Sequence, residues 1–403
     1  MSSLFAKRME KVPKSFIREI LKFTQNPDVI SFAGGLPNPK FFPVEEIKKS
    51  TVKVLDSHGA QALQYSTTEG HLPLREFICD YYWRKKKLKV TPEEIIITNG
   101  AQQAIALLCK TFLNRREKVV LERPAYLGAI QAISFYEPEF HSVDVDEDGI
   151  NIEQLERKYK EHKIKFVYSV VNFSNPTGIT YSAEKRKAMA KVLEKYNTLF
   201  LEDDPYYEWR FTGEHLPSVK SHLYHNVIMI GSFSKIVSPG FRIGWICAER
   251  DLMEKINISK QAADLHSSTF AQYVLHQYLT DYDVEVHLKT LRKVYNSQKN
   301  AMIEAMGKYF PEEVRFTRPE GGMFLWVTMP KHVSSRDILD VVLPQKLAFV
   351  PGDTMYVDGT GFNTMRLNYT NSPEDKIEKG IKILGDAIKK ILTETKTAVP
   401  LGY

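Results

Sequence analysis

The sequence predicts an α/β protein with a mostly parallel central sheet flanked by helices and a smaller α+β domain. Between residues 94 and 248, short apolar segments alternate with amphipathic segments of helical period. This pattern is typical of strands buried on both faces by covering helices. After residue 285 a long helical stretch leads to strands joined by a Glu-Gly-Gly turn. We therefore expect an N-terminal arm with part of the small domain at 1–45, a large domain at 46–285 and a small domain at 286–403.

The individual elements follow from the apolar pattern. Strands are expected at residues 94–98, 118–122, 140–145, 165–171, 198–202, 226–231 and 242–248. Helices are expected between them at 101–113, 126–136, 151–162 and 182–196. In the second part we expect strands within 314–330, a helix at 335–345, short strands at 346–352 and 364–370, and a closing helix at 373–394. The Gly- and Pro-rich stretch 31–43 predicts irregular chain lying across the domain boundary.

The composition limits the classes of function. The chain has 403 residues, of which 43% are hydrophobic and 26% charged, which indicates an ordinary globular protein rather than a disordered one. Its net charge of +6 is mild for this length, so we expect no nucleic-acid partner. The densest basic run, "WRKKKLK" at 83–89, is interpreted as a solvated helix face, with a nucleic-acid or membrane patch as the less favoured alternative.

Cysteine usage and the absence of a leader pattern predict the cytoplasm. The three cysteines, Cys79, Cys109 and Cys247, are far apart and odd in number, which argues against a disulfide framework and against a metal site. The first residues lack the apolar core of a signal peptide, and no run approaches the roughly 18 apolar residues that span a bilayer. We therefore expect neither a metal nor a membrane partner.

Several predicted strands end in polar or conformationally special residues. In "TNGAQQAI" (98–105), the backbone N–H groups of Ala101 and Gln102 would lie at a helix N-terminus and suit an anion, although many such turns are only strand–helix junctions. Tyr126 could offer an aromatic face to a flat ligand or simply be a boundary tyrosine. Asn175, in "NPTG", could be a fixed amide donor or an ordinary turn residue.

Two further segments supply charged groups. "LEDDPYYEW" (201–209) ends a strand with Asp203 and Asp204, and adjacent like charges at a sheet edge are costly unless a cation faces them. Two solvated loop acids are the alternative interpretation. "GSFSKIVSPGFRIGW" (231–245) contains Lys235, whose pKa we expect to be lowered by the nearby cation Arg242. A lysine in an anion-binding site is a candidate for imine chemistry with an aldehyde.

Together these groups match the needs of one ligand. A lysine suits an aldehyde, and a carboxylate suits a protonated ring nitrogen. An arginine, serines and a helix N-terminus suit a phosphate, while a tyrosine face suits a flat ring. An asparagine and a second tyrosine suit a phenolate oxygen. Pyridoxal 5′-phosphate (PLP) carries all of these features.

The chain resembles the class I and II aminotransferases of PLP-dependent transferase fold type I over nearly its whole length. The motifs "NPTG", "EDDPYY" and "SFSKIVSPGFRIGW" carry this resemblance by their order and spacing. The motifs "AGGLPNP", "QYSTTEG" and "EGGMF" make it most similar to the kynurenine/2-aminoadipate and archaeal aromatic aminotransferases. The resemblance implies transfer of the amino group of an aromatic or 2-aminoadipate/glutamate-class L-amino acid to a 2-oxo acid, with 2-oxoglutarate expected, by a ping-pong mechanism.

The resemblance also implies roles for residues that match the family's motifs. Lys235 matches the lysine that forms the imine with the cofactor and moves the proton. Asp203 matches the partner of the ring nitrogen, Tyr206 and Asn175 match the groups on the phenolate oxygen, and Tyr126 matches the stacking ring. The phosphate ligands correspond to Arg242, Ser232, Ser234 and the backbone of Ala101 and Gln102. Here Gly-Ala replaces the Ser-containing phosphate turn of many members, which removes one hydroxyl contact.

Substrate and subunit contacts are implied in the same way. Arg366, in "MRLNY", matches the arginine that holds the substrate α-carboxylate, and Gly35 matches a backbone contact beside it. Arg18, in "SFIREIL", matches an N-terminal arginine that contacts the substrate side chain, with an ordinary helix-surface arginine as the alternative. Tyr65, in "LQYSTTEG", matches a tyrosine that reaches the phosphate of the neighbouring subunit. A homodimer with shared active sites is therefore implied.

Two other functions are compatible with such a chain. A β-lyase or a cyclopropane-forming synthase would keep the cofactor and change the reaction. A non-catalytic sensor would resemble the transcription regulators that place a winged helix–turn–helix before this fold. Because "AGGLPNP" begins about 30 residues into the chain, we expect no room for that module. Amino-group transfer is therefore the favoured prediction.

Overall fold

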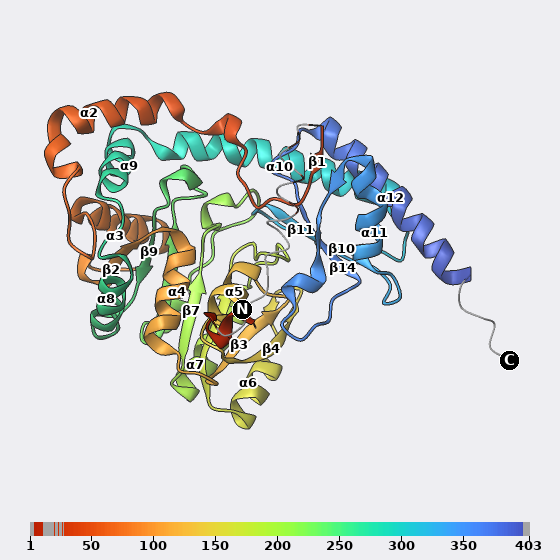
Figure 1. The fold of residues 1–403 in the computed structure, drawn as a ribbon, viewed down its shortest axis with the longest axis horizontal. Coiled ribbons are helices and arrows are strands. Elements are labelled where there is room, and N and C mark those ends of the chain that lie inside the picture. The colour runs from red at the N-terminus through yellow and green to blue at the C-terminus, as the bar shows by residue number, and fades with distance from the viewer. Residues whose placement is uncertain (1–3, 11–19, 21–22, 24–25, 27, 398–403) are drawn as a thin grey trace.

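The computed structural model of the protein describes residues 4–10, 20, 23, 26 and 28–397. Its central feature is an eight-stranded sheet with the order β2-β9-β8-β7-β6-β3-β4-β5 (Figure 1). In chain order the strands are β2 (Ile95–Thr98), β3 (Lys118–Arg123), β4 (Glu139–Asp146), β5 (Gly149–Ile150), β6 (Ile164–Val170), β7 (Leu199–Asp203), β8 (Val227–Ser232) and β9 (Gly244–Cys247). The seven strands predicted between residues 94 and 248 are all present, with bounds within two residues of those expected, whereas β5 was not predicted.

The sheet is mostly parallel, as predicted. Strands β8, β7, β6, β3 and β4 run parallel to their neighbours in this series. Strand β9 is antiparallel to both β8 and β2, and the short β5 is antiparallel to β4. All residues of β2, β8 and β9 are buried, which agrees with a sheet covered on both faces.

Successive residues of the strands enter two different cores. Val119 and Leu121 of β3 belong to the core on one face, and Val120 between them belongs to the core on the other. This alternation follows from the period of two along a strand. The first core includes Ile105 of α4, and the second includes Leu155 of α6, so helices cover both faces.

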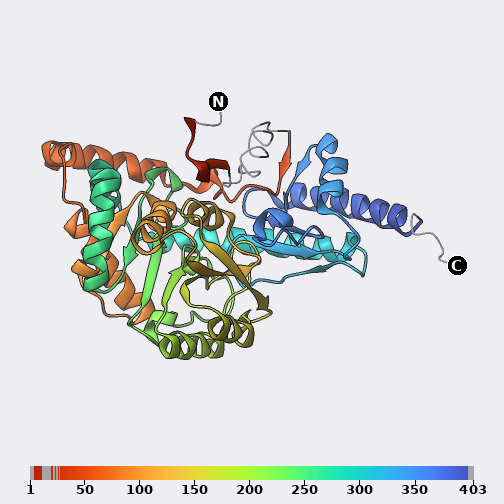
Figure 2. The same cartoon turned by 60° about the horizontal axis from the view of Figure 1, so that its bottom comes forward.

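The helices of this part surround the sheet (Figures 1 and 2). They are α2 (Val44–Ala62), α3 (Leu72–Lys86), α4 (Gly100–Phe112), α5 (Leu127–Ser134), α6 (Ile152–Glu161), α7 (Ala183–Tyr196), α8 (Arg250–Asp264) and α9 (Thr269–Asp281). Short 3₁₀ helices lie at Lys7–Glu10, Pro39–Phe41, Pro92–Glu94, Tyr207–Trp209, Val219–Ser221, Pro239–Phe241, Leu343–Gln345 and Gly352–Met355. No helix in the described part of the chain is long and apolar enough to cross a membrane.

The C-terminal elements gather at one side of the molecule, at the right in Figures 1 and 2. A four-stranded antiparallel sheet has the order β10-β11-β14-β13. Its strands are β10 (Arg315–Phe316), β11 (Phe324–Thr328), β13 (Val350–Pro351) and β14 (Thr364–Asn368), and its helices are α10 (Val284–Tyr309), α11 (Ser335–Val342) and α12 (Glu374–Thr397). This mixture of strands and helices matches the predicted α+β pattern, while the domain bounds at 45 and 285 stay a prediction.

Two local predictions were wrong. The expected strand at 346–352 is divided: β12 (Leu347–Ala348) pairs in parallel with β1 (Ile30–Ser31), whereas β13 pairs with β14. The chain thus changes sheets at the fully buried Phe349. The expected strand at 242–248 begins only at Gly244, because Arg242 ends a 3₁₀ turn in the left-handed conformation, with φ of 53°.

Candidate active site

The last residues of three central strands open into one cavity of about 310 Å³. Val170 ends β6, Asp203 ends β7 and Ser232 ends β8, and all three line this cavity. Ligands bind at this edge in open α/β sheets. The complete lining is Gly35, Leu36, Ala101, Gln102, Tyr126, Val170, Asn175, Asp203, Pro205, Tyr206, Ser232, Ser234, Lys235, Pro239, Arg242 and Arg366. The structure therefore brings together every predicted site residue except Tyr65 and Arg18.

Asp203 is buried, which excludes the interpretation as a solvated loop acid. The Tyr168 hydroxyl donates a hydrogen bond of 2.6 Å to its Oδ2. Its Oδ1 is also buried and has no hydrogen-bond partner among the described residues. Burial raises the pKa of Asp203 to about 7, opposed by the Tyr168 hydrogen bond and reinforced by the charge of Asp204. Because Asp203 lies in the cavity wall, its Oδ1 can accept a hydrogen bond from an N–H group of a bound ligand.

Lys235 lies in the turn after β8 and reaches into the same cavity. Its Nζ donates to the backbone oxygen of Gly35 at 2.8 Å, and its own carbonyl accepts from Trp209 Nε1 at 2.8 Å. Burial lowers the pKa of Lys235 to about 7, and the charges of Arg366 and Arg242 lower it further. The predicted direction is confirmed, but burial is a larger cause than the neighbouring cation.

A further part of the cavity wall is suited to an anion. Ala101 and Gln102 lie in the first turn of α4, whose first N–H groups have no partner within the helix. Arg242 Nη2 donates to the backbone oxygen of Asn99 at 3.2 Å, which places the guanidinium beside this turn. Gly100 has φ of +75°, and a Cβ there would lie 2.6 Å from Arg242 Nη2, so only glycine permits this approach. Ser232 and Ser234 line the same cavity, and Ser232 Oγ accepts from the Ser234 backbone N–H at 3.1 Å.

Two tyrosines and an asparagine also line the cavity. Tyr126 immediately precedes α5, and burial raises its pKa to about 12. Burial also raises the pKa of Tyr206, against a hydrogen bond with the Asn175 side chain that lowers it. The Tyr206 ring meets the ring of Phe324 edge-on at 6.2 Å. The cavity wall thus offers aromatic surface together with an amide and phenolic hydroxyls.

Arg366 enters the cavity from β14, so both parts of the molecule form the site. Its Nη1 donates to Asn175 Oδ1 at 2.8 Å, and its Nη2 donates to the Ala33 carbonyl at 2.7 Å. Its Nε is buried without a hydrogen-bond partner in the part of the chain that the structure describes. The guanidinium lies over the Phe324 ring at 4.2 Å, and burial lowers the pKa of Arg366 to about 10.

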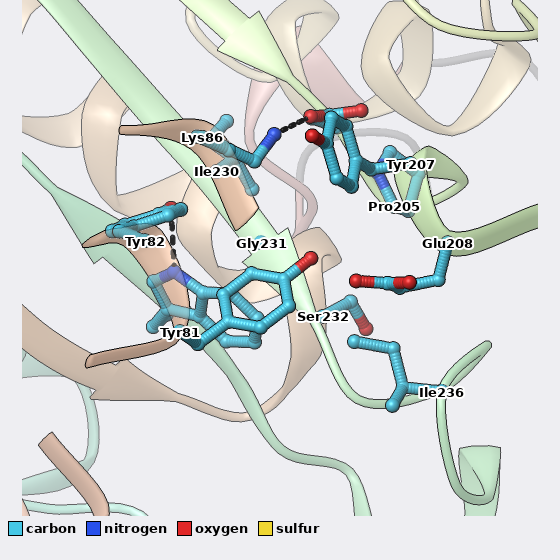
Figure 3. Close-up of a pocket in the computed structure, with 12 residues that line it drawn as sticks. Tyr81, Tyr82, Lys86, Pro205, Tyr207, Glu208, Ile230, Gly231, Ser232 and Ile236 are labelled. Carbon is cyan, nitrogen blue, oxygen red and sulfur yellow. Dashed lines mark hydrogen bonds and ion pairs between the residues drawn. The ribbon is translucent and has the colours of Figure 1, made fainter. Parts of the chain in front are cut away.

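The second carboxylate of the acidic pair faces a cation that the sequence did not identify. Asp204 forms a buried ion pair with Lys86 and accepts from Asn172 Nδ2 at 2.7 Å. Figure 3 shows Lys86 beside the ring of Tyr207, whose centroid is 3.8 Å from Lys86 Nζ. The interpretation of 83–89 as a solvated face is therefore wrong at Lys86, whose side chain is 3% exposed. Lys86, from the basic run at 83–89, is therefore the cationic partner that was expected for the acidic pair.

Two predicted site residues lie outside the cavity. Tyr65 is 79% exposed, and its ring meets that of His266 edge-on at 5.7 Å. It is not among the residues that line the cavity of its own chain, and its role toward a neighbouring subunit stays a prediction. Arg18 lies outside the described residues.

The chain is similar to known proteins over nearly its whole length. Residues 27–384 match the family "Aminotransferase class I and II".

The chain belongs to this family.

It is 39% identical to the aromatic-amino-acid aminotransferase 1 of Thermococcus litoralis, over 96% of this chain and 94% of that protein. It is also 39% identical to the 2-aminoadipate transaminase of Thermus thermophilus, over 97% and 98%. The crystal structure of the kynurenine aminotransferase of Pyrococcus horikoshii, solved in complex with PMP, is similar with a TM-score of 0.92, 40% identity and coverage of 96% and 98%. The chain is therefore a PLP-dependent aminotransferase of fold type I.

The cavity of this aminotransferase fits the cofactor. The unpartnered Oδ1 of Asp203 suits a protonated ring nitrogen, and the turn at Gly100 with Arg242 suits a phosphate. Lys235 lies in the same cavity, with an amine whose lowered pKa favours reaction with an aldehyde. The residues of this cavity therefore fit PLP.

Sequence reasoning missed two residues of this aminotransferase that act on the acidic pair. Tyr168 holds Asp203 from within β6, and the only signal for it was a hydroxyl in a mostly apolar strand. Lys86 holds Asp204 from the end of α3, and its signal was hidden in a run of exposed basic residues. Neither partner is near the acidic pair in sequence, so only the fold reveals them.

The environment of Lys235 predicts the pH dependence of its reactivity. In the cofactor-free protein, the amine becomes nucleophilic as pH rises through its pKa, so we expect half-maximal acylation near pH 7. An ordinary lysine reaches this point at about pH 10.4. Competitive acylation followed by peptide mass spectrometry measures it, with the exposed Lys48 as an internal reference. A half-point at the ordinary value would contradict the lowered pKa.

Proposed function

We propose that this aminotransferase transfers the amino group of an aromatic or 2-aminoadipate-class L-amino acid to 2-oxoglutarate by a ping-pong mechanism. The observation that carries the proposed site is the pairing, in one cavity, of Asp203 with an unpartnered buried oxygen and Lys235 with a pKa lowered to about 7. The substrate class is supported by the names of relatives that align over nearly the whole chain.

Asp203 is proposed to hold the ring nitrogen of the cofactor through Oδ1. Bound PLP supplies an aldehyde that takes up the amino group and a protonated ring that accepts the electron pair left when the Cα proton departs. A carboxylate beside the ring nitrogen keeps that nitrogen protonated. The Tyr168 hydrogen bond to Oδ2 orients the carboxyl group so that Oδ1 remains available.

Lys235 is proposed to carry the proton between the substrate and the cofactor. Because burial lowers its pKa to about 7, a large share of the amine is neutral and able to accept the Cα proton near neutral pH. The hydrogen bond from Trp209 Nε1 to the Lys235 carbonyl fixes the backbone from which the side chain extends. The proton is then returned by the same Nζ.

Arg366 is proposed to bind the α-carboxylate of each substrate. The guanidinium has five N–H donors, and the contacts with Asn175 and Ala33 occupy two of them. The unpartnered Nε and the remaining Nη hydrogens are suited to a bidentate carboxylate. The Gly35 carbonyl lies in the same cavity and accepts from Lys235, so substrate binds close to the proton carrier. Arg18 stays a candidate for the substrate side chain.

The cofactor's remaining polar groups are assigned to residues of the cavity wall. Arg242, Ser232, Ser234 and the backbone of Ala101 and Gln102 are proposed to bind the phosphate. Tyr206 and Asn175 are proposed to bind the phenolate oxygen, and Tyr126 to stack on the ring. These assignments place a separate set of donors at each polar end of the cofactor, so its orientation is fixed.

The protein is also proposed to be a homodimer in the cytoplasm. Val52 and Leu55 on α2, together with Leu63, Tyr65 and Leu72 after it, are large apolar residues that are more than two-fifths exposed. Such a concentration of exposed apolar side chains indicates a surface that another subunit covers. It includes Tyr65, which would then reach the partner's phosphate. All three cysteines are free, which suits a reducing compartment.

Replacement of the proposed proton carrier tests the assignment. We expect Lys235→Ala to lower the transamination rate by about 10²- to 10⁴-fold, because acid–base catalysis is lost. The variant should still bind PLP through the phosphate and Asp203, as measured by equilibrium dialysis. Lys48→Ala, at an exposed position, is the matched control and should retain the wild-type rate. Wild-type transamination by Lys235→Ala would refute the proposed role.

An amino-donor panel at fixed 2-oxoglutarate tests the substrate proposal. We expect turnover with aromatic amino acids or 2-aminoadipate, and glutamate formed in equal amount to the new 2-oxo acid. Release of ammonia without any acceptor would instead show a lyase on the same fold. Turnover restricted to donors outside these classes would contradict the proposed specificity.

A further inference from the structure

We propose that Lys260 and Asp264 are positioning residues that keep the Asn99 side chain away from the phosphate-binding turn. Both lie on α8, which packs against α4 (Figure 1). The inference rests on the proposed placement of the phosphate at the N-terminus of α4. The proposal gives a function to the ion pair of Lys260 and Asp264, which is hydrogen-bonded to the residue that precedes α4.

Lys260 and Asp264 form an ion pair one helical turn apart, in which Lys260 is buried and Asp264 is partly exposed. Lys260 Nζ donates to Oδ1 and Oδ2 of Asp264 at 2.6 and 2.7 Å, and its side chain is fully buried. Its Nζ also donates to Gln103 Oε1 at 3.1 Å and to Ser267 Oγ at 3.0 Å. A buried ammonium group with this many acceptors is held in one position.

The Asp264 carboxylate in turn holds the residue that precedes α4. Its Oδ2 accepts from Asn99 Nδ2 at 2.6 Å and from Gln103 Nε2 at 2.7 Å. The Asn99 backbone N–H donates to Gln103 Oε1 at 2.8 Å. Because a carboxylate only accepts hydrogen bonds, both amide NH₂ groups must face Asp264. Asn99 is therefore tied to this cluster through its side chain and its backbone.

Because the Asn99 side chain is bonded to Asp264, the first turn of α4 has no side-chain cap. Asparagine is among the most favourable residues at a helix N-cap, where its side-chain oxygen accepts from the second or third N–H of the helix. Asn99 occupies the N-cap of α4, yet its side chain makes no capping hydrogen bond within the described structure. The N–H groups that it would take are those of Ala101 and Gln102, which are the ones proposed for the phosphate.

The hydrogen bonds of Asn99 to Gln103 and Asp264 also fix the Asn99 backbone carbonyl, which contacts Arg242. The Asn99 carbonyl accepts from Arg242 Nη2 at 3.2 Å, and the adjoining Gly100 lies against this guanidinium. The chain leaves α8 at Leu265, which has φ of +63°, a strained conformation for a non-glycine residue. This residue directly follows Asp264, the last residue of α8. The pair therefore leaves the helix N–H groups and Arg242 available to one anion.

The test compares the affinity of the cofactor-free protein for PLP with its affinity for pyridoxal, which lacks the phosphate. In Asp264→Asn, Asn99 is released and caps α4 itself. We expect the Kd for PLP to rise about tenfold while the Kd for pyridoxal changes by less than about twofold. Adding Asn99→Gly removes the competing cap and should return the Kd for PLP to within about threefold of wild type.

Two further variants make the result decisive. Lys260→Met combined with Asp264→Leu removes both charges, leaves none buried alone, and should give the same shift and the same rescue. Asp80→Asn, in an exposed i,i+4 pair with Arg84, is the matched control and should change neither Kd. Equal changes for both ligands, no change, or no rescue by Asn99→Gly would overturn the inference. A wild-type protein that bound pyridoxal as tightly as PLP would instead contradict the proposed phosphate site.

Discussion

The site depends on a buried carboxyl group whose hydrogen bonding is incomplete. Asp203 ends the central strand β7, receives Tyr168 on Oδ2 and has no donor for Oδ1 among the described residues. Burial of an ionisable group without a full set of partners is costly, and the protonated ring nitrogen that we propose for Oδ1 would supply the missing donor. Lys235 lines the same cavity, and burial lowers its pKa to about 7. Burial therefore prepares both the proposed cofactor anchor and the proposed proton carrier.

The cavity also requires the two parts of the molecule to meet. Arg366 comes from the antiparallel C-terminal sheet. It donates a hydrogen bond to Asn175, in the loop that follows strand β6 of the central sheet. Its second hydrogen bond goes to the carbonyl of Ala33, next to the short strand β1 that pairs with β12. The proposed carboxylate clamp is thus fixed by three segments that are far apart in the sequence, and substrate binding is coupled to how these segments pack.

The positions of the strands and the residues at their ends could be predicted from the sequence because both follow from local patterns, whereas the order of the strands in the sheet was not predicted. Apolar runs predicted the strands, and the polar residues at or soon after their ends predicted the site residues Asp203, Asn175 and Lys235. Partners could not be predicted in this way. The pairing of Lys86 with Asp204 joins positions 118 residues apart, and the basic run around Lys86 is otherwise typical of a solvated face. Asn99 was also missed, because its local pattern predicts a helix cap and only the fold brings Asp264 to it.

The most direct test of the account is to locate the lysine that reacts with the cofactor. The protein is reduced with borohydride in the presence of PLP, digested and analysed by peptide mass spectrometry. The account predicts one phosphopyridoxyl group per chain, attached to Lys235. Attachment to a different lysine, or an unmodified Lys235 in protein that has bound PLP, would contradict the proposed active site.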